Sequence, residues 1–358
     1  LRRIIMAYIS FQPNDFFNTL LYTGDGSARS LTGVGFQPDF VWMKGRSFSD
    51  NHIVCDSARG VEKYLQPDTS AAEGTGPPAP NESVTSFDAD GFSIGGWSAI
   101  NTNTANQVAW NWKAGTTSGI ATNGSTTITP TAYSFNQTCG FSVVKYTGNG
   151  TSGAKIAHGL GKTPTFVFVK RLGSSGSWDV VSRLMGATYY IRLDTDGAKA
   201  TGTWAFNDTL PDSVNFTVGD NAETNSSDGN VAYCFAPING YSAMGKFDGN
   251  GDTRGCFIQT GFKPAFVMIK RTNGTGPWMI YHDKVPGYNE TNTYIQANAT
   301  SAEDTNAGNF GMSMYATGFQ PQSTSGATGP NQDGDDYVYL AFANKPIASS
   351  NSKAGTAR

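Results

Sequence analysis

The chain has 358 residues, too many for one small core and suited to two or three domains. Charged residues make up 15%, below the ~25% usual for globular domains, while Gly, Ser, Thr and Asn are abundant. The formal charge of -3 and the pI of about 5.6 leave no basic field to hold nucleic acid. No apolar run reaches the ~18 residues of a transmembrane helix, so we expect neither a nucleic-acid partner nor membrane insertion.

Residues 1–14 are expected to form an N-terminal arm. The start Leu1–Ile5 is too short for a secretory signal and no apolar segment follows it, so Met6 resembles a natural start preceded by an extension. A chain without such a signal, yet with a surface-like composition, is typical of a virion component, which assembles inside the cell and works outside it.

Three similar copies follow along the chain, and a repeat of this kind decides the architecture. Each opens with an apolar strand that ends on an aromatic residue, followed by a Gly-x-Gly turn in which Gly, Asn or Asp supplies positive φ. The three opening strands are residues 16–22, 141–146 and 241–247, and their turns are residues 23–26, 147–150 and 248–251.

Each copy then carries the motif Pro-x-Phe-Val-x-x-Lys, which begins at Pro38, Pro164 and Pro264 and has an Arg close behind. Its aromatic and β-branched residues predict a strand, and the lack of polar alternation predicts that both faces are covered. The lysine admits two interpretations, a basic site or a solvated strand end. We favour the solvated end because charges are common where elements return to water.

A second strand follows each motif after a Gly/Ser/Asn loop, so the pair predicts a hairpin with a long tip. Every copy closes with a similar strand, at residues 108–112, 231–235 and 338–342. Short strands every ~8–12 residues with Gly-rich turns are typical of β-sandwiches and jelly rolls. We therefore predict an all-β protein of three tandem β-sandwich, jelly-roll-like modules.

The predicted boundaries place repeat 1 at residues 15–115, repeat 2 at 140–238 and repeat 3 at 239–347. Residues 116–139 are rich in Thr, Ser and Asn and predict a linker or an added hairpin around residues 125–129. Residues 348–358 are small and polar and are expected to form a C-terminal tail.

These motifs resemble an uncharacterised repeat domain of tail-fibre-like and other virion surface proteins of tailed phages, especially marine ones. The resemblance covers roughly residues 15–347. It is carried by Met-Ala-Tyr-Ile-Ser-Phe-Gln-Pro at Met6–Pro13, Tyr-Thr-Gly-x-Gly, Gly-Phe-x-Pro-x-Phe-Val-x-x-Lys, and Val-Tyr-Leu-Ala-Phe-Ala at Val338–Ala343. Repeat 2 departs by inserting residues 161–163 before Pro164, and repeat 1 by closing on Trp112-Lys113. The resemblance implies virion localisation and supplies no catalytic residues.

No motif in the sequence predicts a catalytic, cofactor-binding or metal-binding residue. Three histidines (His52, His158, His282) are expected to be packing or surface residues, and two carboxylate clusters (Asp88–Asp90, Asp333–Asp336) to be solvated turn acids rather than a glycosidase pair. Residues 248–252 have alternate oxygen ligands like a calcium loop, but a hairpin turn is favoured. The four cysteines (Cys55, Cys139, Cys234, Cys256) are expected to be buried free thiols, with disulfides as the alternative.

Two binding interpretations remain. The seven tryptophans could form sugar-stacking platforms, although most aromatics lie in strand runs and favour the core. The long loops Gln66 to Ser86, Gly219 to Asn230 and Phe319 to Asp336 differ between copies and are the candidate recognition loops.

The favoured hypothesis is a non-enzymatic virion surface protein, a tail or capsid fibre. It would form a homo-oligomer, contact other virion proteins and bind a host-surface glycan. The alternatives are a decoration protein that cements neighbouring virion subunits, and a carbohydrate-active enzyme.

Overall fold

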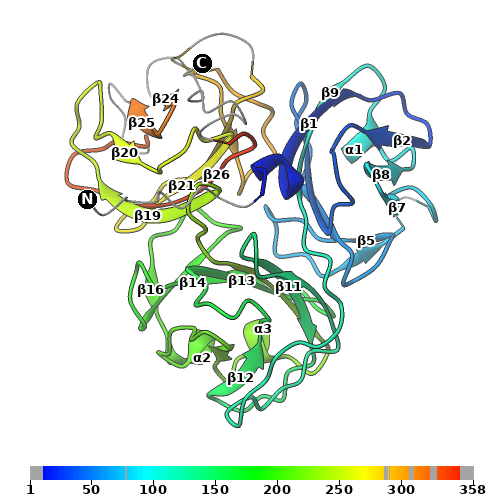
Figure 1. Cartoon of the computed structure of the whole chain (residues 1–358), viewed down its shortest axis with the longest axis vertical. Coiled ribbons are helices and arrows are strands. Elements are labelled where there is room, and N and C mark those ends of the chain that lie inside the picture. Colours follow the sequence, from blue (N-terminus) through cyan, green and yellow to red (C-terminus); the bar gives the residue numbers. More distant parts are fainter. Residues whose placement is uncertain are drawn as a thin grey trace, which may run out of the picture.

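The computed structural model describes residues 11–76, 79–285, 289, 291–305, 310–322 and 329–346. Three β-rich repeats lie side by side around a common centre, so the modules form a compact cluster and not a string (Figure 1). Within these described residues the strands form several antiparallel sheets with three short α-helices, which confirms the predicted all-β, sandwich-like fold. Most of the expected arm and tail lies outside the described residues. None of the helices in the described part of the chain is long and apolar enough to span a membrane.

Repeat 1 comprises η1 (Pro13–Asp15), β1 (Phe17–Thr23), β2 (Arg29–Thr32), β3 (Phe40–Gly45), β4 (Ile53–Asp56), β5 (Lys63–Tyr64), β6 (Gly74–Thr75), β7 (Val84–Asp88), β8 (Gly91–Ile94), α1 (Ser98–Asn101) and β9 (Asn106–Trp112). Repeat 2 comprises β10 (Ala132–Asn136), β11 (Phe141–Tyr146), β12 (Ala154–Ala157), β13 (Phe166–Arg171), β14 (Trp178–Ser182), β15 (Tyr189–Arg192), β16 (Ala200–Thr201), α2 (Thr203–Phe206), β17 (Asn215–Val218), α3 (Ala222–Asn225) and β18 (Asn230–Phe235). Repeat 3 comprises β19 (Ser242–Asp248), β20 (Ile258–Gln259), β21 (Phe266–Arg271), β22 (Trp278–His282), β23 (Ile295–Gln296), β24 (Gly311–Tyr315), β25 (Gly318–Gln322) and β26 (Asp336–Phe342).

Each repeat has an inner sheet in which the closing strand lies between the opening strand and the motif strand. The orders are β1-β9-β3-β4, β11-β18-β13-β14-β15 and β19-β26-β21-β22-β23, all antiparallel. The predicted hairpins form, because β3, β13 and β21 pair antiparallel with β4, β14 and β22. Smaller outer sheets, β2-β8-β7, β12-β17 and β20-β25-β24, cover one face of each inner sheet.

Residues 116–139 hold one strand, where the sequence predicts a linker or a hairpin. That strand, β10, pairs antiparallel with β11 and so extends the inner sheet of repeat 2 at its edge. The expected hairpin strand instead makes an isolated parallel bridge from Ile128 to Ile156. The segment therefore belongs to the sheet of repeat 2.

The inner sheets are buried on both faces, as the motif predicts, because each face belongs to a different core. In β3, Phe40 and Trp42 enter a central core shared by all three repeats, while Val41 and Met43 enter the core between the two sheets of repeat 1. The same alternation holds for β13 and β21. The aromatic position of the motif thus holds the repeats together, and the valine position holds each sandwich together.

The Gly-x-Gly turns are fixed by a buried asparagine that comes just before each closing strand. In repeat 2 the Asn225 side chain accepts a hydrogen bond from Asn149 N (2.8 Å) and donates to the carbonyls of Thr151 (3.0 Å) and Gly219 (2.6 Å). Asn101 and Asn331 hold the other two turns in the same way.

The two glycines of each turn serve different needs. The second glycine has positive φ, as predicted: 69° at Gly26, 67° at Gly150 and 68° at Gly251. The first glycine is required for close approach, because a Cβ at Gly148 would lie 2.1 Å from the carbonyl carbon of Asn225.

Candidate functional site

The motif lysines are buried between repeats and are not solvated strand ends. Lys44, Lys170 and Lys270 are all 0% exposed. The prediction of a solvated strand end is therefore wrong for all three. A buried ammonium must find hydrogen-bond acceptors, and the neighbouring repeat supplies part of them.

Each lysine donates to one carbonyl oxygen of its own repeat (Asp50, Gly176 or Arg271) and to carbonyl oxygens of a segment that reaches over from the preceding repeat. We call this the bridging segment: residues 66–73 of repeat 1, 192–199 of repeat 2 and 296–303 of repeat 3. The contacts that cross between repeats are Lys170 Nζ to Ser70 O (3.0 Å), Lys270 Nζ to Asp196 O (3.1 Å) and Gly197 O (2.8 Å), and Lys44 Nζ to Thr300 O (3.0 Å).

A ring N–H makes a second contact to the same bridging segment. The donor is the residue opposite the lysine on the next strand, and the acceptor is a main-chain carbonyl. The bonds are Trp178 Nε1 to Gln66 O (2.9 Å), Trp278 Nε1 to Arg192 O (2.8 Å) and His52 Nε2 to Gln296 O (2.9 Å).

Two main-chain hydrogen bonds complete each junction at equivalent positions. One joins the end of the bridging segment to the residue two places after the lysine: Glu73 N to Leu172 O, Lys199 N to Thr272 O and Glu303 N to Arg46 O. The other runs from the loop before the next strand: Gly176 N to Ser70 O, Gly276 N to Asp196 O and Asp50 N to Thr300 O. Repeat 1 thus binds repeat 2, repeat 2 binds repeat 3, and repeat 3 binds repeat 1.

Burial sets the electrostatics of these junctions. It lowers the pKa of Lys44 and Lys170 to about 8 and of Lys270 to about 7, although the nearby carboxylates of Asp68, Asp194 and Asp196 favour the charged form. Burial also lowers the pKa of His52 to about 3. Its Nδ1 accepts a hydrogen bond from Trp42 Nε1 (2.9 Å), which leaves Nε2 as the donor to repeat 3.

The junction between repeats 1 and 2 has an additional buried ion pair. Arg59 Nε lies 2.5 Å from Asp56 Oδ2, and the other end of its guanidinium lies 3.2 Å from Glu73 of the bridging segment. Tyr233 of repeat 2 donates its hydroxyl to the same Asp56 oxygen (2.7 Å). Removing one partner from such a buried network is costly, because the remaining charge is left uncompensated.

The junctions were missed from the sequence although a signal was there. The bridging segments follow Tyr64, Tyr190 and Tyr294 in the shared pattern Tyr-Leu/Ile-Gln/Arg-x-Asp/Asn, with an alanine four residues further on. The Asp or Asn of this pattern accepts the main-chain N–H of the ring donor in every repeat: Asp68 from His52, Asp194 from Trp178 and Asn298 from Trp278.

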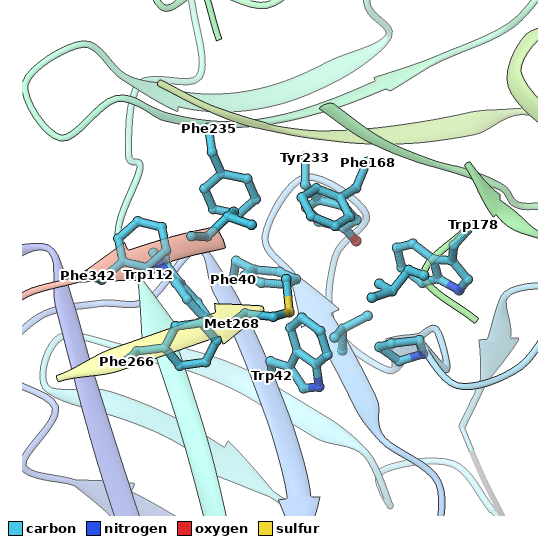
Figure 2. A pocket seen from close by; sticks show the side chains of 14 residues that line it. Phe40, Trp42, Trp112, Phe168, Trp178, Tyr233, Phe235, Phe266, Met268 and Phe342 are labelled. Atoms are coloured by element: carbon cyan, nitrogen blue, oxygen red, sulfur yellow. The ribbon is translucent and has the colours of Figure 1, made fainter. Parts of the chain in front are cut away.

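The aromatic residues of the three repeats meet around a small cavity at the centre of the molecule (Figure 2). Its volume is about 30 Å³ and its lining is apolar: Phe40, Trp42, Val54, Pro67, Trp112, Phe168, Trp178, Leu193, Tyr233, Phe235, Phe266, Met268, Leu340 and Phe342. The space is small for any organic ligand and offers no polar partner to water. The side chains of the three sheets leave this space unfilled where they meet. The aromatic residues around it are buried, which confirms the prediction that most aromatics belong to the core.

The candidate catalytic groups are engaged in local structure. His52, His158 and His282 are buried, as packing residues are. Asp90 accepts the main-chain N–H groups of Gly33 (3.1 Å) and Gly35 (2.6 Å) in a turn, whereas Asp335 is buried and pairs with Arg271 (2.7 Å). The prediction of a solvated turn acid is therefore wrong for Asp335.

The calcium-like turn and the cysteines also find local roles. The side-chain oxygen of Asn250 accepts from Asp252 N (3.1 Å) and from Asn331 Nδ2 (2.7 Å), so it serves the turn. Among the described residues no group of three or more His, Cys, Asp or Glu side chains is placed to hold a metal ion. All four cysteines are free thiols, and three are buried as predicted, whereas Cys256 is exposed.

The candidate recognition loops are only partly free. Residues 66–73 of the first loop form a bridging segment, so the interpretation of that stretch as a variable tip is wrong. The loop from Gly219 to Asn230 contains α3 and the turn-holding Asn225. The loop from Phe319 to Asp336 begins in β25 and ends beside Asn331, and residues 323–328 lie outside the described part.

The fold and its three equivalent junctions define a closed, three-repeat all-β protein. Over residues 12–346 the sequence matches the family described as a domain of unknown function, DUF7483. The match covers most of the chain, so the protein belongs to the DUF7483 family. Comparison with curated proteins and with solved structures found no match.

Proposed function

We propose that this protein is a non-enzymatic surface protein of a tailed-phage virion, a tail or capsid fibre that contacts the host surface. The main support for this proposal is that the polar residues that recur in all three repeats have structural contacts. The motif lysines and the turn asparagines all bind main-chain atoms within or between repeats. What recurs three times therefore serves to hold the scaffold together.

Such a scaffold suits a particle that must survive outside the cell. Three repeats that pack on one another around a shared core expose less apolar surface than a string of separate modules would. The outer loops beyond the bridging segments then form the part that differs between repeats, and loops on a fixed β scaffold are well placed to carry recognition. In this proposal the protein assembles as a homo-oligomer with other virion proteins.

The test is the location of the protein in intact particles. Antibodies against the purified chain would be used for immunogold labelling of particles from a host that produces it, with quantitative mass spectrometry for copy number. Label on fibres, and inhibition of particle adsorption by the purified protein, is the expected result. Label spread over the shell without inhibition would favour a decoration protein. Absence from the particle would refute the proposal.

The enzyme alternative has its own readout. Release of reducing ends from host polysaccharide by the purified chain, lost in Asp88→Asn or Asp335→Asn, would identify a carbohydrate-active enzyme and defeat the fibre proposal. We expect no release, because Asp335 is buried against Arg271 and Asp88 accepts a hydrogen bond from Ser93 (2.7 Å) in a turn.

A further inference from the structure

Repeat 2 has charged residues at positions where the other repeats are apolar or neutral. Asp179 lies opposite Val169 in the sheet, and the equivalent positions hold Ile53 in repeat 1 and Met279 in repeat 3. Its neighbour on the next strand is Arg192, where repeat 3 has a glutamine. On α3, Glu223 stands two residues before the turn asparagine, where repeat 1 has the buried Ala99.

These three side chains form one cluster that leads from the core to the surface. Arg192 Nε lies 3.2 Å from Asp179 Oδ1, and Arg192 Nη2 lies 2.8 Å from Glu223 Oε2. The Asp179 side chain is 0% exposed, whereas Arg192 is 33% and Glu223 23% exposed. The second oxygen of Asp179 has no hydrogen-bond donor, and the carboxyl group approaches that of Glu223.

Burying the Asp179 carboxyl group in this cluster lowers the stability of the folded protein. Burial, and then the charge of Glu223, raise the pKa of Asp179 well above its ordinary value. Buried ion clusters are often no more stable than the apolar residues that could replace them, and repeats 1 and 3 show that apolar residues fit this strand position. A cluster kept at such a cost is a candidate for binding.

Two aromatic rings flank the exposed end of the cluster. Tyr190 and Trp204 are half-buried, and their ring centroids lie 4.8 Å apart in an edge-to-face arrangement. The Arg192 guanidinium carbon lies 5.7 Å from each ring. Trp204 comes from α2, at the outer side of repeat 2 (Figure 1). In repeat 1, Tyr64 and Trp97 make a similar pair (4.7 Å) without the charged cluster.

We propose that Trp204, Tyr190, Arg192 and Glu223 form a saccharide-binding site on repeat 2. The C–H face of a pyranose ring would pack on an aromatic ring, while neighbouring hydroxyl groups donate to Glu223 and accept from Arg192. Asp179 is a positioning residue, because its Oδ1 pairs with the Arg192 guanidinium from the buried side. The inference deepens the proposed function, since a host-surface glycan would be the ligand.

The test uses the full chain and saturation-transfer NMR with the methyl glycosides of glucose, galactose, mannose and N-acetylglucosamine. We expect at least one of them to bind, and Trp204→Ala and Glu223→Gln each to weaken its affinity at least tenfold. Trp97→Ala is the matched control, because it removes the equivalent ring pair of repeat 1, and it should leave the affinity unchanged. Failure of all four sugars to bind, or equal binding by the Trp204 variant, overturns the proposal.

A second variant separates binding from folding. The triple substitution Asp179→Ile, Arg192→Gln, Glu223→Ala gives repeat 2 the residues of repeat 1. We expect it to abolish sugar binding while the thermal midpoint stays the same or rises. A marked fall in the midpoint would mean that the cluster is structural and would refute the proposal. Sugar binding by a protein that is absent from particles would refute only the virion role, and a particle protein without sugar binding would refute only this site.

Discussion

The junction lysines allow a quantitative test, and Lys270→Met is the most informative change. Methionine is likewise unbranched and only one atom shorter, but it has no hydrogen-bond donor. Lys270 Nζ donates to the carbonyls of Asp196 (3.1 Å), Gly197 (2.8 Å) and Arg271 (2.9 Å). The Asp196 carbonyl keeps a second donor in Gly276 N (2.8 Å), whereas the Gly197 carbonyl has no other donor among the described residues.

Two opposing contributions decide the magnitude. Three charge-assisted hydrogen bonds contribute about 1.5–3 kcal/mol each. Against this, burial lowers the pKa of Lys270 from 10.5 to about 7, and a difference of that size corresponds to roughly 5 kcal/mol of unfavourable burial of the charge. The hydrogen bonds exceed that cost in most of their range, and the orphaned Gly197 carbonyl adds about 1–3 kcal/mol. We therefore expect Lys270→Met to lower the free energy of unfolding by about 2–4 kcal/mol.

Urea unfolding followed by tryptophan fluorescence measures this difference, with thermal unfolding as a second readout. At about 2.1 cal/mol/K per residue, a chain of this length loses several degrees in melting temperature. Lys246→Met is the matched control, because Lys246 is exposed in β19 of the same repeat, and it should change stability by less than about 0.5 kcal/mol. If Lys270→Met is as stable as that control, the junction lysine contributes nothing net and our account of the junctions is wrong.

Three further predictions follow from the same structure. The pKa of His52 is about 3 in the folded protein and 6.5 in the unfolded chain. Its contribution to the free energy of unfolding is therefore complete above pH 6.5 and falls by about 2 kcal/mol at pH 5. In urea titrations, the loss of stability between pH 7.5 and pH 5 should be smaller for His52→Gln than for the unmodified protein. Gly148→Ala places a Cβ 2.1 Å from the Asn225 carbonyl carbon and should cost about 3 kcal/mol, whereas Gly124→Ala, with nothing within 4 Å, should be neutral in the same assay; equal stabilities would contradict the close-approach argument. A chain cut after Gly119, in an exposed stretch, should yield two pieces that co-purify, because repeat 1 is bound by both other repeats; separation of the pieces on a sizing column would contradict the ring.

Much of the fold could be predicted from local patterns. The motif Pro-x-Phe-Val-x-x-Lys indicates a strand covered on both faces, and β3, β13 and β21 are buried as that pattern requires. The pattern does not say what covers the second face. Whether an apolar face meets its own sheet partner or a distant repeat depends on the path of the chain over more than a hundred residues, and no local periodicity encodes that path.

The lysines show why the junctions were misread. A basic residue at the end of an apolar strand usually marks the return to water, and Lys44 has that sequence context. Its acceptor in the neighbouring repeat, the carbonyl of Thr300, is 256 residues away and is a main-chain atom, so the type of side chain at that position gives no sequence signal. The bridging segments did have a signature, but the weak pattern after Tyr64 lies inside a stretch whose composition is typical of a loop.

The saccharide-site candidate was equally hard to predict. Asp179 looks like an ordinary charge in a strand until the register shows that Ile53 and Met279 occupy the same place. Its partner Glu223 lies on a different element and 44 positions away in sequence (223 − 179), and only the folded chain brings the two together.

The way repeat 3 docks on repeat 1 closes the set of three repeats in this chain. Every unit carries both the donor and the acceptor half of one joint, so nothing in a single unit forbids a fourth. In this chain, however, the set is complete, because each of the three inner sheets turns one apolar face into a single shared core. A single added repeat would leave one donor half and one acceptor half without partners, so we expect such a chain to lengthen by whole sets of three repeats.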